Sequence, residues 1–487
     1  MKHFFSFQAG KTFLLHNIKI KTFVNNTVVF PIKAVILITQ MQTYRPREHC
    51  MKISWFKKVI SPETGAYLAG YSTNDKSVAR ADDLYMHGLL ADDGVNRVLI
   101  ISFDLLGLDW IYIKQVREKC AALLKIPVSN VLFTCTHTHS GPETRSLARK
   151  PDQLNTEYLH KLETMILDAV KNIPEGREAA AYFYSSKCDE NRNRRYTTGC
   201  NRASFTAYRR DMAPLATEYA DKELGELIFL DPANALPLYV IGNYGAHPLA
   251  GHAPGLGGLR ISSDYPGFFR DVIKEETGAE CMFISGAAGD LVPKEDECGL
   301  RGARLMGENL AKAAISGMVD AQRNPGRFKL DDKLGAISKF VKVPLRKHQM
   351  ERIPASYNTE NNSLELEIQV IAVGDICFIG VPGELCCELG QEMKWHSPFR
   401  RTWIAYNATA YCSYIGHANM LVSGGYEGAS QWFTARGGLM LLNAAADAMF
   451  ELRETLYCSD GDDIYPDCLK PELVNIPPNQ KKTVRSR

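Results

Sequence analysis

The 487-residue sequence predicts an α/β fold in which a mixed β-sheet is flanked by helices. The first observation behind this prediction is that short apolar runs alternate with amphipathic stretches from Met51 onward. The second is that the apolar runs are nearly continuous, which is typical of strands covered on both faces. The third is the composition, 45% hydrophobic and 23% charged, which is enough to bury a large core.

The elements are predicted from their periodicity. A first strand opens at Met51, and further apolar runs predict strands at Arg97–Phe103, Asn130–Thr134, Leu238–Tyr244, Cys281–Ser285, Asp375–Val381 and Thr402–Asn407. Apolar residues recurring at helical spacing predict helices at Trp110–Leu124, Glu157–Asn172, Tyr265–Glu276, Gly302–Ala321, Glu384–Lys394 and Leu439–Leu456. Strands that alternate with helices in this way indicate a sheet packed against helices.

The chain divides into three parts. Residues 1–50 are predicted to be a poorly ordered extension or a mis-assigned start, residues 51–457 one large domain, and residues 458–487 a loosely attached tail. Within the domain, Asn324–Asn362 is polar and irregular, and we expect it to be a surface excursion.

Composition excludes several classes of function. The 57 basic and 55 acidic residues give a net charge of only +2 without long single-sign runs, so we expect no nucleic-acid partner. The only long apolar run near the amino terminus, Val28–Thr39, is too short to span a bilayer, and we expect no integral membrane segment. The 13 cysteines show no CxxC spacing, which favours reduced thiols and a cytoplasmic location.

The strongest local motif is NVLFTCTHTHSGP, from Asn130 to Pro142. His137 and His139 follow an apolar run, and side chains two residues apart in an extended segment share a face. Two imidazoles aimed into one cavity are typical of a metal site, although a histidine pair in an ordinary hydrogen-bonded loop is the alternative.

Other polar segments also follow directly on predicted strands. They are Ala246-His247-Pro248, Gly286–Asp290, Pro382-Gly383-Glu384 and Tyr411–Tyr414. In α/β sheets, ligands bind where the loops after the carboxyl ends of strands converge. Each segment taken singly fits ordinary loop chemistry, since Glu384 can simply begin a helix. Together with the histidine pair, they indicate a shared site.

These motifs resemble the neutral, non-lysosomal ceramidase family in kind and order. The matching stretches are THTHSGP, YGAHP with ISSDYPG, SGAAGD, GVPGE, NATAYCSY and YEGAS, which together run from Thr136 to Ser430. The resemblance covers roughly Met51 to Leu456, and it leaves no room for the carboxy-terminal immunoglobulin-like domain of that family. It implies the fold of the ceramidase catalytic domain and a zinc-dependent amidase activity.

The resemblance also implies a ligand set for Zn²⁺. It assigns His137, His247, Glu384 and Tyr414 as metal ligands, an arrangement that leaves one coordination position open. Without this resemblance, the sequence would predict only that Tyr414 is an aromatic residue of the core.

Further roles follow by the same analogy. His139 is expected to face the substrate and move a proton, Tyr426 to donate to the developing oxyanion, and Asp290 to orient a ligand imidazole or the attacking water. Arg194, with Arg192 close behind, is expected to bind substrate; for either arginine the alternative is a solvated surface charge.

One departure from the family bears on the substrate. Val292 stands where ceramidases carry a serine held to be catalytic, and Ser285 is the nearest upstream hydroxyl. We therefore expect a metal-activated water to attack an amide, or an ester, of a small polar N-acyl molecule other than ceramide. The alternatives are a metal enzyme opening a lactone or glycosidic bond of a carbohydrate-derived substrate, and an inactive scaffold that binds a polar ligand.

Overall fold

The structure is a computed structural model that describes residues 23–24, 27–28, 50–70, 74–146, 151–195, 219–249, 259–294 and 299–458. The chain separates into two units, and the smaller one contains residues 1–46. Of those residues only a short antiparallel pair is described, β1 (Phe23–Val24) with β2 (Thr27–Val28). The predicted extension and the predicted tail thus lie almost entirely outside the described residues.

The larger unit is built on two β-sheets. Eight strands form the first sheet in the order β13-β11-β10-β8-β3-β5-β6-β7. Two of its pairs, β11 with β13 and β6 with β7, are parallel and the others antiparallel, so the sheet is mixed as predicted. The strands are β3 (Met51–Val59), β5 (Tyr85–Asp92), β6 (Arg97–Phe103), β7 (Val131–Cys135), β8 (Arg177–Lys187), β10 (Glu223–Leu230), β11 (Pro237–Tyr244) and β13 (Glu280–Ser285).

The second sheet has four strands, β15 (Leu334–Pro344), β16 (Ser363–Val373), β17 (Ile376–Gly380) and β19 (Arg401–Ala405). The expectation of a surface excursion over Asn324–Asn362 is wrong for Leu334–Pro344, because β15 pairs with β16 along its whole length. Polar residues such as Ser338 and Lys339 lie only partly buried on this edge strand, which is why the segment reads as irregular.

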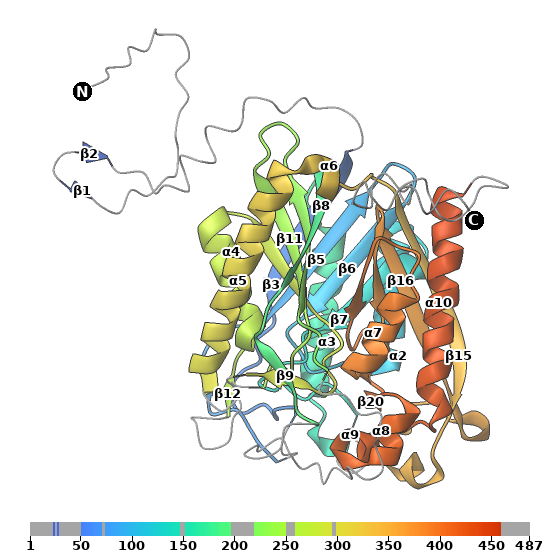
Figure 1. The fold of residues 1–487 in the computed structure, drawn as a ribbon. Helices are drawn as coiled ribbons and strands as arrows, with labels where there is room; N and C mark the ends of the chain where they lie inside the picture. Colours follow the sequence, from blue (N-terminus) through green and yellow to red (C-terminus); the bar gives the residue numbers. More distant parts are fainter. Residues whose placement is uncertain are drawn as a thin grey trace, which may run out of the picture. The chain divides into compact units, whose positions relative to one another are not determined.

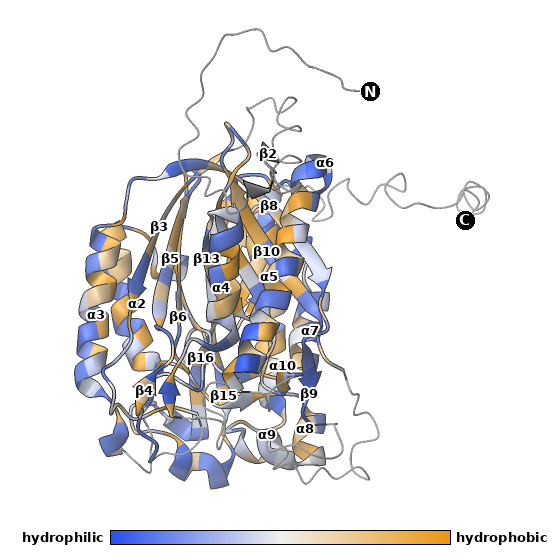
Figure 2. Cartoon of the chain, turned by 90° about the vertical axis from the view of Figure 1, so that its left-hand side faces the viewer, coloured by the Kyte–Doolittle hydropathy of each residue, from blue (hydrophilic) through white to orange (hydrophobic). Residues whose placement is uncertain are grey.

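Helices cover the outer face of each sheet (Figure 1). The eight-stranded sheet is covered by α2 (Trp110–Leu124), α3 (Thr156–Lys171), α4 (Asp264–Thr277) and α5 (Gly299–Arg323), and the four-stranded sheet by α7 (Cys387–Trp395) and α10 (Arg436–Tyr457). Figure 2 shows α3 and α5 with both polar and apolar residues, as expected for helices with one face on a sheet.

The two sheets cover each other's inner faces. Val98 and Ile100 of β6 pack in the core between the sheets, whereas Leu99 and Ile101 pack under the helices. The nearly continuous apolar strands are therefore covered on both faces, as predicted, by helices on the outer face and by the other sheet on the inner face.

The loops that follow β7, β11, β13, β17 and β19 carry the polar segments singled out in the sequence. The short elements near these loops are β9 (Asn191–Asn193), β12 (Arg260–Ile261), β14 (Leu291–Pro293), β18 (Glu384–Leu385), β20 (Tyr414–Ile415), α8 (Ala418–Ser423) and α9 (Gly425–Ser430). Figure 1 shows β9, β12, β20, α8 and α9 at one end of the sheets. The ten described cysteines are all free thiols, and eight of them are buried.

Candidate metal centre

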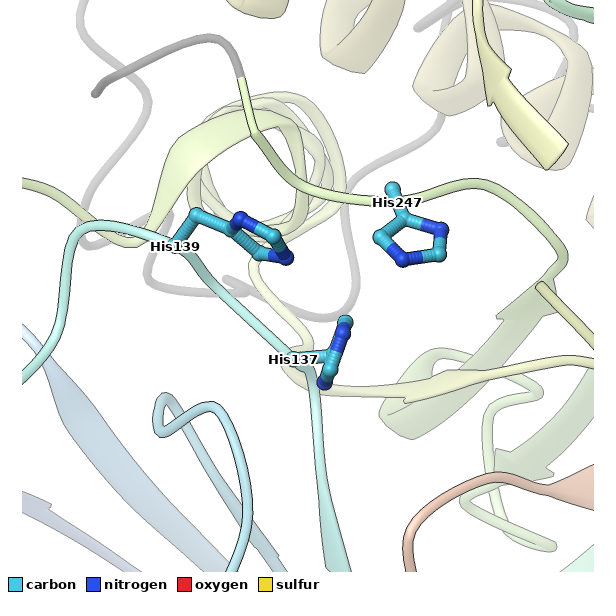
Figure 3. A group of neighbouring side chains, drawn as sticks. All are labelled: His137, His139 and His247. Atoms are coloured by element: carbon cyan, nitrogen blue, oxygen red, sulfur yellow. The ribbon is translucent and has the colours of Figure 1, made fainter. Parts of the chain in front are cut away.

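Three histidines meet at this end of the sheets. Figure 3 shows His137 and His139, from the loop after β7, pointing toward His247, from the loop after β11. One ring nitrogen of each lies within 4.8 Å of those of the other two. All three side chains are buried. This group can hold a metal ion.

His137 and His139 converge for a different reason from the one predicted. β7 ends at Cys135, and His137 has a left-handed backbone with φ 72°, so the segment is not extended there. A non-glycine residue is rare in this region, and such strain concentrates at functional sites. The His137 N–H donates to the Leu105 carbonyl at 2.9 Å, which helps to fix the turn.

Backbone carbonyls set the orientation of two of the imidazoles. Nδ1 of His137 lies 2.7 Å from the Leu106 carbonyl oxygen, and Nδ1 of His247 lies 2.6 Å from that of Ala288. In the neutral ring the proton is then on Nδ1, so Nε2 carries a lone pair. For His137 this tautomer requires that the Asn407 amide, 2.8 Å from Nδ1, turn its oxygen toward the ring. Burial, together with Arg194, lowers the pKa of His247 to about 4, so this imidazole is neutral at pH 7.

Both lone pairs face the same carboxylate oxygen. Oε2 of Glu384 lies 3.5 Å from Nε2 of His137 and 3.3 Å from Nε2 of His247. Glu384 does not begin a helix, contrary to the prediction, since it lies in β18 and α7 starts at Cys387. The strand places the carboxylate inward, where it is buried.

Two tyrosine hydroxyls hold the Glu384 carboxylate. Tyr411 donates to Oε1 at 2.5 Å and Tyr406 to Oε2 at 3.3 Å. Burial, and the carboxylate itself, raise the pKa of Tyr411, so its hydroxyl keeps the proton that it donates. Partners of this kind fix the orientation of a metal-binding carboxylate.

Tyr414 lies opposite Glu384 in the β18–β20 pair. Its phenol oxygen accepts a hydrogen bond from Arg194 at 3.0 Å. Arg194 is also paired with Glu427 at 2.6 Å, and Glu427 pairs in turn with Arg195 at 2.9 Å. Because all these charges are buried, Arg194 is not the solvated surface charge that was its alternative.

The other predicted residues surround this centre. Tyr426 on α9 is 42% exposed, and its ring centroid is 5.5 Å from that of Tyr414. Asp290 accepts hydrogen bonds from the Cys387 N–H at 2.8 Å and the Asn193 amide at 3.0 Å. Asp290 lies two residues after Ala288, whose carbonyl orients His247, so it holds the loop that positions this imidazole.

Two further sequence observations concern the missing serine. Val292 is buried in β14, opposite Arg192 of β9. Ser285 does not offer a free hydroxyl, because its Oγ donates to the Thr136 carbonyl at 2.8 Å.

Sequence reasoning missed the residues that support the centre. Tyr406 and Tyr411 hold Glu384, Glu427 holds Arg194, and the Asn407 amide lies 2.8 Å from Nδ1 of His137. Tyr411 and Glu427 lie inside NATAYCSY and YEGAS, so the motifs were the available signal for those two.

The residues define an α/β protein with two stacked sheets and a buried histidine and carboxylate group at one end. None of the helices formed by the described residues is long and apolar enough to cross a membrane. No protein-family model and no curated protein matches the sequence.

Solved structures do match this fold. The neutral ceramidase from Pseudomonas aeruginosa aligns with a TM-score of 0.68 at 16% identity, over 85% of this chain and 76% of that one. A ceramidase complexed with C2 aligns with a TM-score of 0.69 at 16% identity, over 86% of this chain and 78% of that one. The chain therefore has the fold of a neutral-ceramidase-type catalytic domain, as the sequence motifs predicted.

Proposed function

We propose that the protein is a zinc-dependent amidase that hydrolyses a small N-acyl compound. The observation that carries this proposal is the convergence of His137 and His247 on one oxygen of Glu384, with both Nδ1 atoms already held by carbonyls. Lone pairs that face a carboxylate in a buried site are favourable when a cation lies between them.

The distances fit zinc. Ligand atoms bonded to tetrahedral zinc at about 2.0–2.1 Å lie about 3.3–3.4 Å apart. The two nitrogen-to-oxygen distances, 3.3 and 3.5 Å, agree with that edge. His137, His247 and Glu384 would hold the ion, and Tyr414 would be the fourth ligand. When bound, zinc lowers the pKa of a water to about 7 and polarises a carbonyl.

The remaining side chains supply proton transfer and charge stabilisation. His139 has its ring centroid 5.0 Å from that of His137 and is not needed as a ligand in this set, so it is available to pass a proton to the leaving amine. Tyr426, partly exposed beside Tyr414, donates to the amide oxygen as negative charge develops there. Arg194 holds the Tyr414 oxygen in place.

The nucleophile is water. Val292 has no hydroxyl, and the Ser285 hydroxyl is engaged with a backbone carbonyl, so neither forms an acyl intermediate. Water adds to the amide carbon, the carbon–nitrogen bond breaks, and the products are a carboxylic acid and an amine. The likeness to ceramidases in fold supports amide hydrolysis, and a free-thiol composition supports a cytoplasmic location.

The test is hydrolysis by purified protein loaded with one equivalent of zinc. A panel of N-acyl amines, N-acyl amino acids and N-acyl sugars is assayed for release of a primary amine, alongside sugar lactones and glycosides. We expect turnover on an N-acyl compound that His247→Ala abolishes and His160→Ala, a change at an exposed histidine of α3, preserves. Turnover only on lactones or glycosides, or binding without turnover, would contradict the amidase proposal.

A further inference from the structure

An arginine that no sequence motif assigned lies beside the proposed catalytic centre. The guanidinium carbon of Arg145 is 4.5 Å from the ring centroid of Tyr411, whose hydroxyl holds Glu384. The same tyrosine ring is stacked with the His137 ring at 6.4 Å between centroids. Arg145 is therefore a cation in contact with a tyrosine ring that also packs near a proposed metal ligand.

Only part of the Arg145 guanidinium is occupied. Nε and Nη2 donate to the two carboxylate oxygens of Glu143 at 2.8 and 2.7 Å. Nη1 makes no hydrogen bond with any residue in the part of the chain that the structure describes. The side chain as a whole is 11% exposed, so a group that binds the guanidinium would lose much of its water.

The geometry of Arg145 is pre-organised. Glu143 is 4% exposed and grips two donors at once, and Tyr411 packs against the guanidinium face. A fork held in this way pays little entropy when its remaining N–H groups bind a carboxylate. Burial opposes the charge, but Glu143 and Tyr411 outweigh it and raise the pKa of Arg145, so the guanidinium stays charged.

The surrounding charges limit how strongly an anion binds. Glu143 neutralises much of the Arg145 charge, and Asp109 is a second carboxyl close by, whose oxygen accepts the Ser146 N–H at 2.8 Å. Burial raises the pKa of Asp109. Arg145 thus favours an acidic group in contact with its free edge, while the Glu143 charge opposes it.

We propose that Arg145 binds an acidic group of the substrate through its free edge, and that the substrates are N-acyl amino acids with a carboxylate close to the scissile amide. This inference rests on the proposed amidase function and narrows it to anionic substrates. A neutral N-acyl amino alcohol or amino sugar would leave the free edge of Arg145 without a partner.

The test compares two probes that differ only in charge, N-octanoylglycine and N-octanoylglycinamide. We expect the wild-type, zinc-loaded enzyme to prefer the acid, and Arg145→Met, which keeps the apolar stem, to reduce the acid-to-amide ratio of kcat/KM about 30-fold, mainly through KM for the acid. Arg145→Lys, which keeps the charge without the fork, should fall between the two.

A second variant, at Glu143, should change KM for the acid in the opposite direction. Glu143→Gln removes the opposing charge but keeps an oxygen that accepts from Arg145, so KM for N-octanoylglycine should fall several-fold. A variant that merely misfolds cannot give this gain. An unchanged acid-to-amide ratio in Arg145→Met, or a wild-type preference for the amide, would overturn the proposal and leave Arg145 as a support for Tyr411.

Binding separates this inference from the proposed function. Calorimetric titration with N-octanoylglycine should show binding that Arg145→Met weakens about 30-fold, whether or not the probe is hydrolysed. Binding that depends on Arg145 without hydrolysis of any probe would reject the amidase function and retain the acidic-group site. Equal affinity of wild type and Arg145→Met for the acid would reject the site even if both probes are hydrolysed.

Discussion

Replacing Tyr411 by phenylalanine tests how much the Glu384 carboxylate, a proposed zinc ligand, depends on the hydroxyl that holds it. The substitution removes only the hydroxyl that donates to Oε1 of Glu384 at 2.5 Å, and it keeps the ring that contacts Arg145 and His137. A hydrogen bond to a charged group is worth about 1.5–3 kcal/mol. At about 1.4 kcal/mol for each factor of ten, zinc affinity should fall about 10- to 100-fold.

The assay is competition for zinc with a chromophoric chelator at pH 7.5. Tyr112→Phe is the matched control, because it also removes a tyrosine hydroxyl bond to a neighbouring segment, at 3.1 Å to the Leu159 carbonyl, but far from the centre. Tyr112→Phe should leave zinc affinity unchanged. If Tyr411→Phe binds zinc within twofold of wild type, Tyr411 does not orient Glu384 for a metal and the reasoning fails.

Two further predictions concern His139 and stability. Gly70→Ala places a methyl group 2.5 Å from Cγ and Nδ1 of His139, so amidase activity should fall at least tenfold while zinc content is retained. Gly65 also has a positive φ, but a methyl group there meets no other atom, so Gly65→Ala should keep activity. Equal losses in both variants would point to backbone strain alone. Glu226 is fully buried with neither oxygen hydrogen-bonded, and burial raises its pKa well above the usual value. The folded state then holds this proton more tightly than the unfolded chain, so the free energy of unfolding should fall as pH rises above about 4.3, and urea unfolding at pH 5 and 8 should show a steeper fall in wild type than in Glu226→Gln. Parallel pH profiles would contradict that assignment.

Much of the fold could be predicted from local pattern. The strand Arg97–Phe103 and the helix Trp110–Leu124 have the predicted bounds. An unbroken short apolar run indicates a strand, and apolar residues at regular helical spacing indicate a helix, so each pattern predicts one type of element. The edge strand β15 was missed, since its partly exposed polar residues hide the alternation until β16 is placed beside it.

The candidate site also contains residues that local motifs predict and residues that they do not. His137, His247 and Glu384 were singled out because their motifs are local, and the structure brings these three together. Their role as metal ligands stays a prediction. The stacking of one sheet on the other was not predictable from periodicity, which is the same for a strand covered by helices and one covered by a sheet. Nor was Arg145, because its contact with Tyr411 joins segments that are far apart in the sequence.

The helix predicted to start at Glu384 shows how a long-range contact overrides local propensity. Residues 384–394 read as one helical stretch, but the pairing of Glu384 with Tyr414 holds the first two residues in a strand. Helix α7 then begins at Cys387. The carboxylate is thereby placed toward the histidines.

The most direct test of the account is the zinc content of purified protein and two single variants, measured by mass spectrometry after dialysis against trace zinc. We expect about one equivalent in wild type and in His139→Ala, and less than about a tenth in Glu384→Ala. This result identifies the ligands as His137, His247 and Glu384, with His139 left for the substrate. Zinc absent from wild type, or lost in His139→Ala and kept in Glu384→Ala, would contradict the central claim.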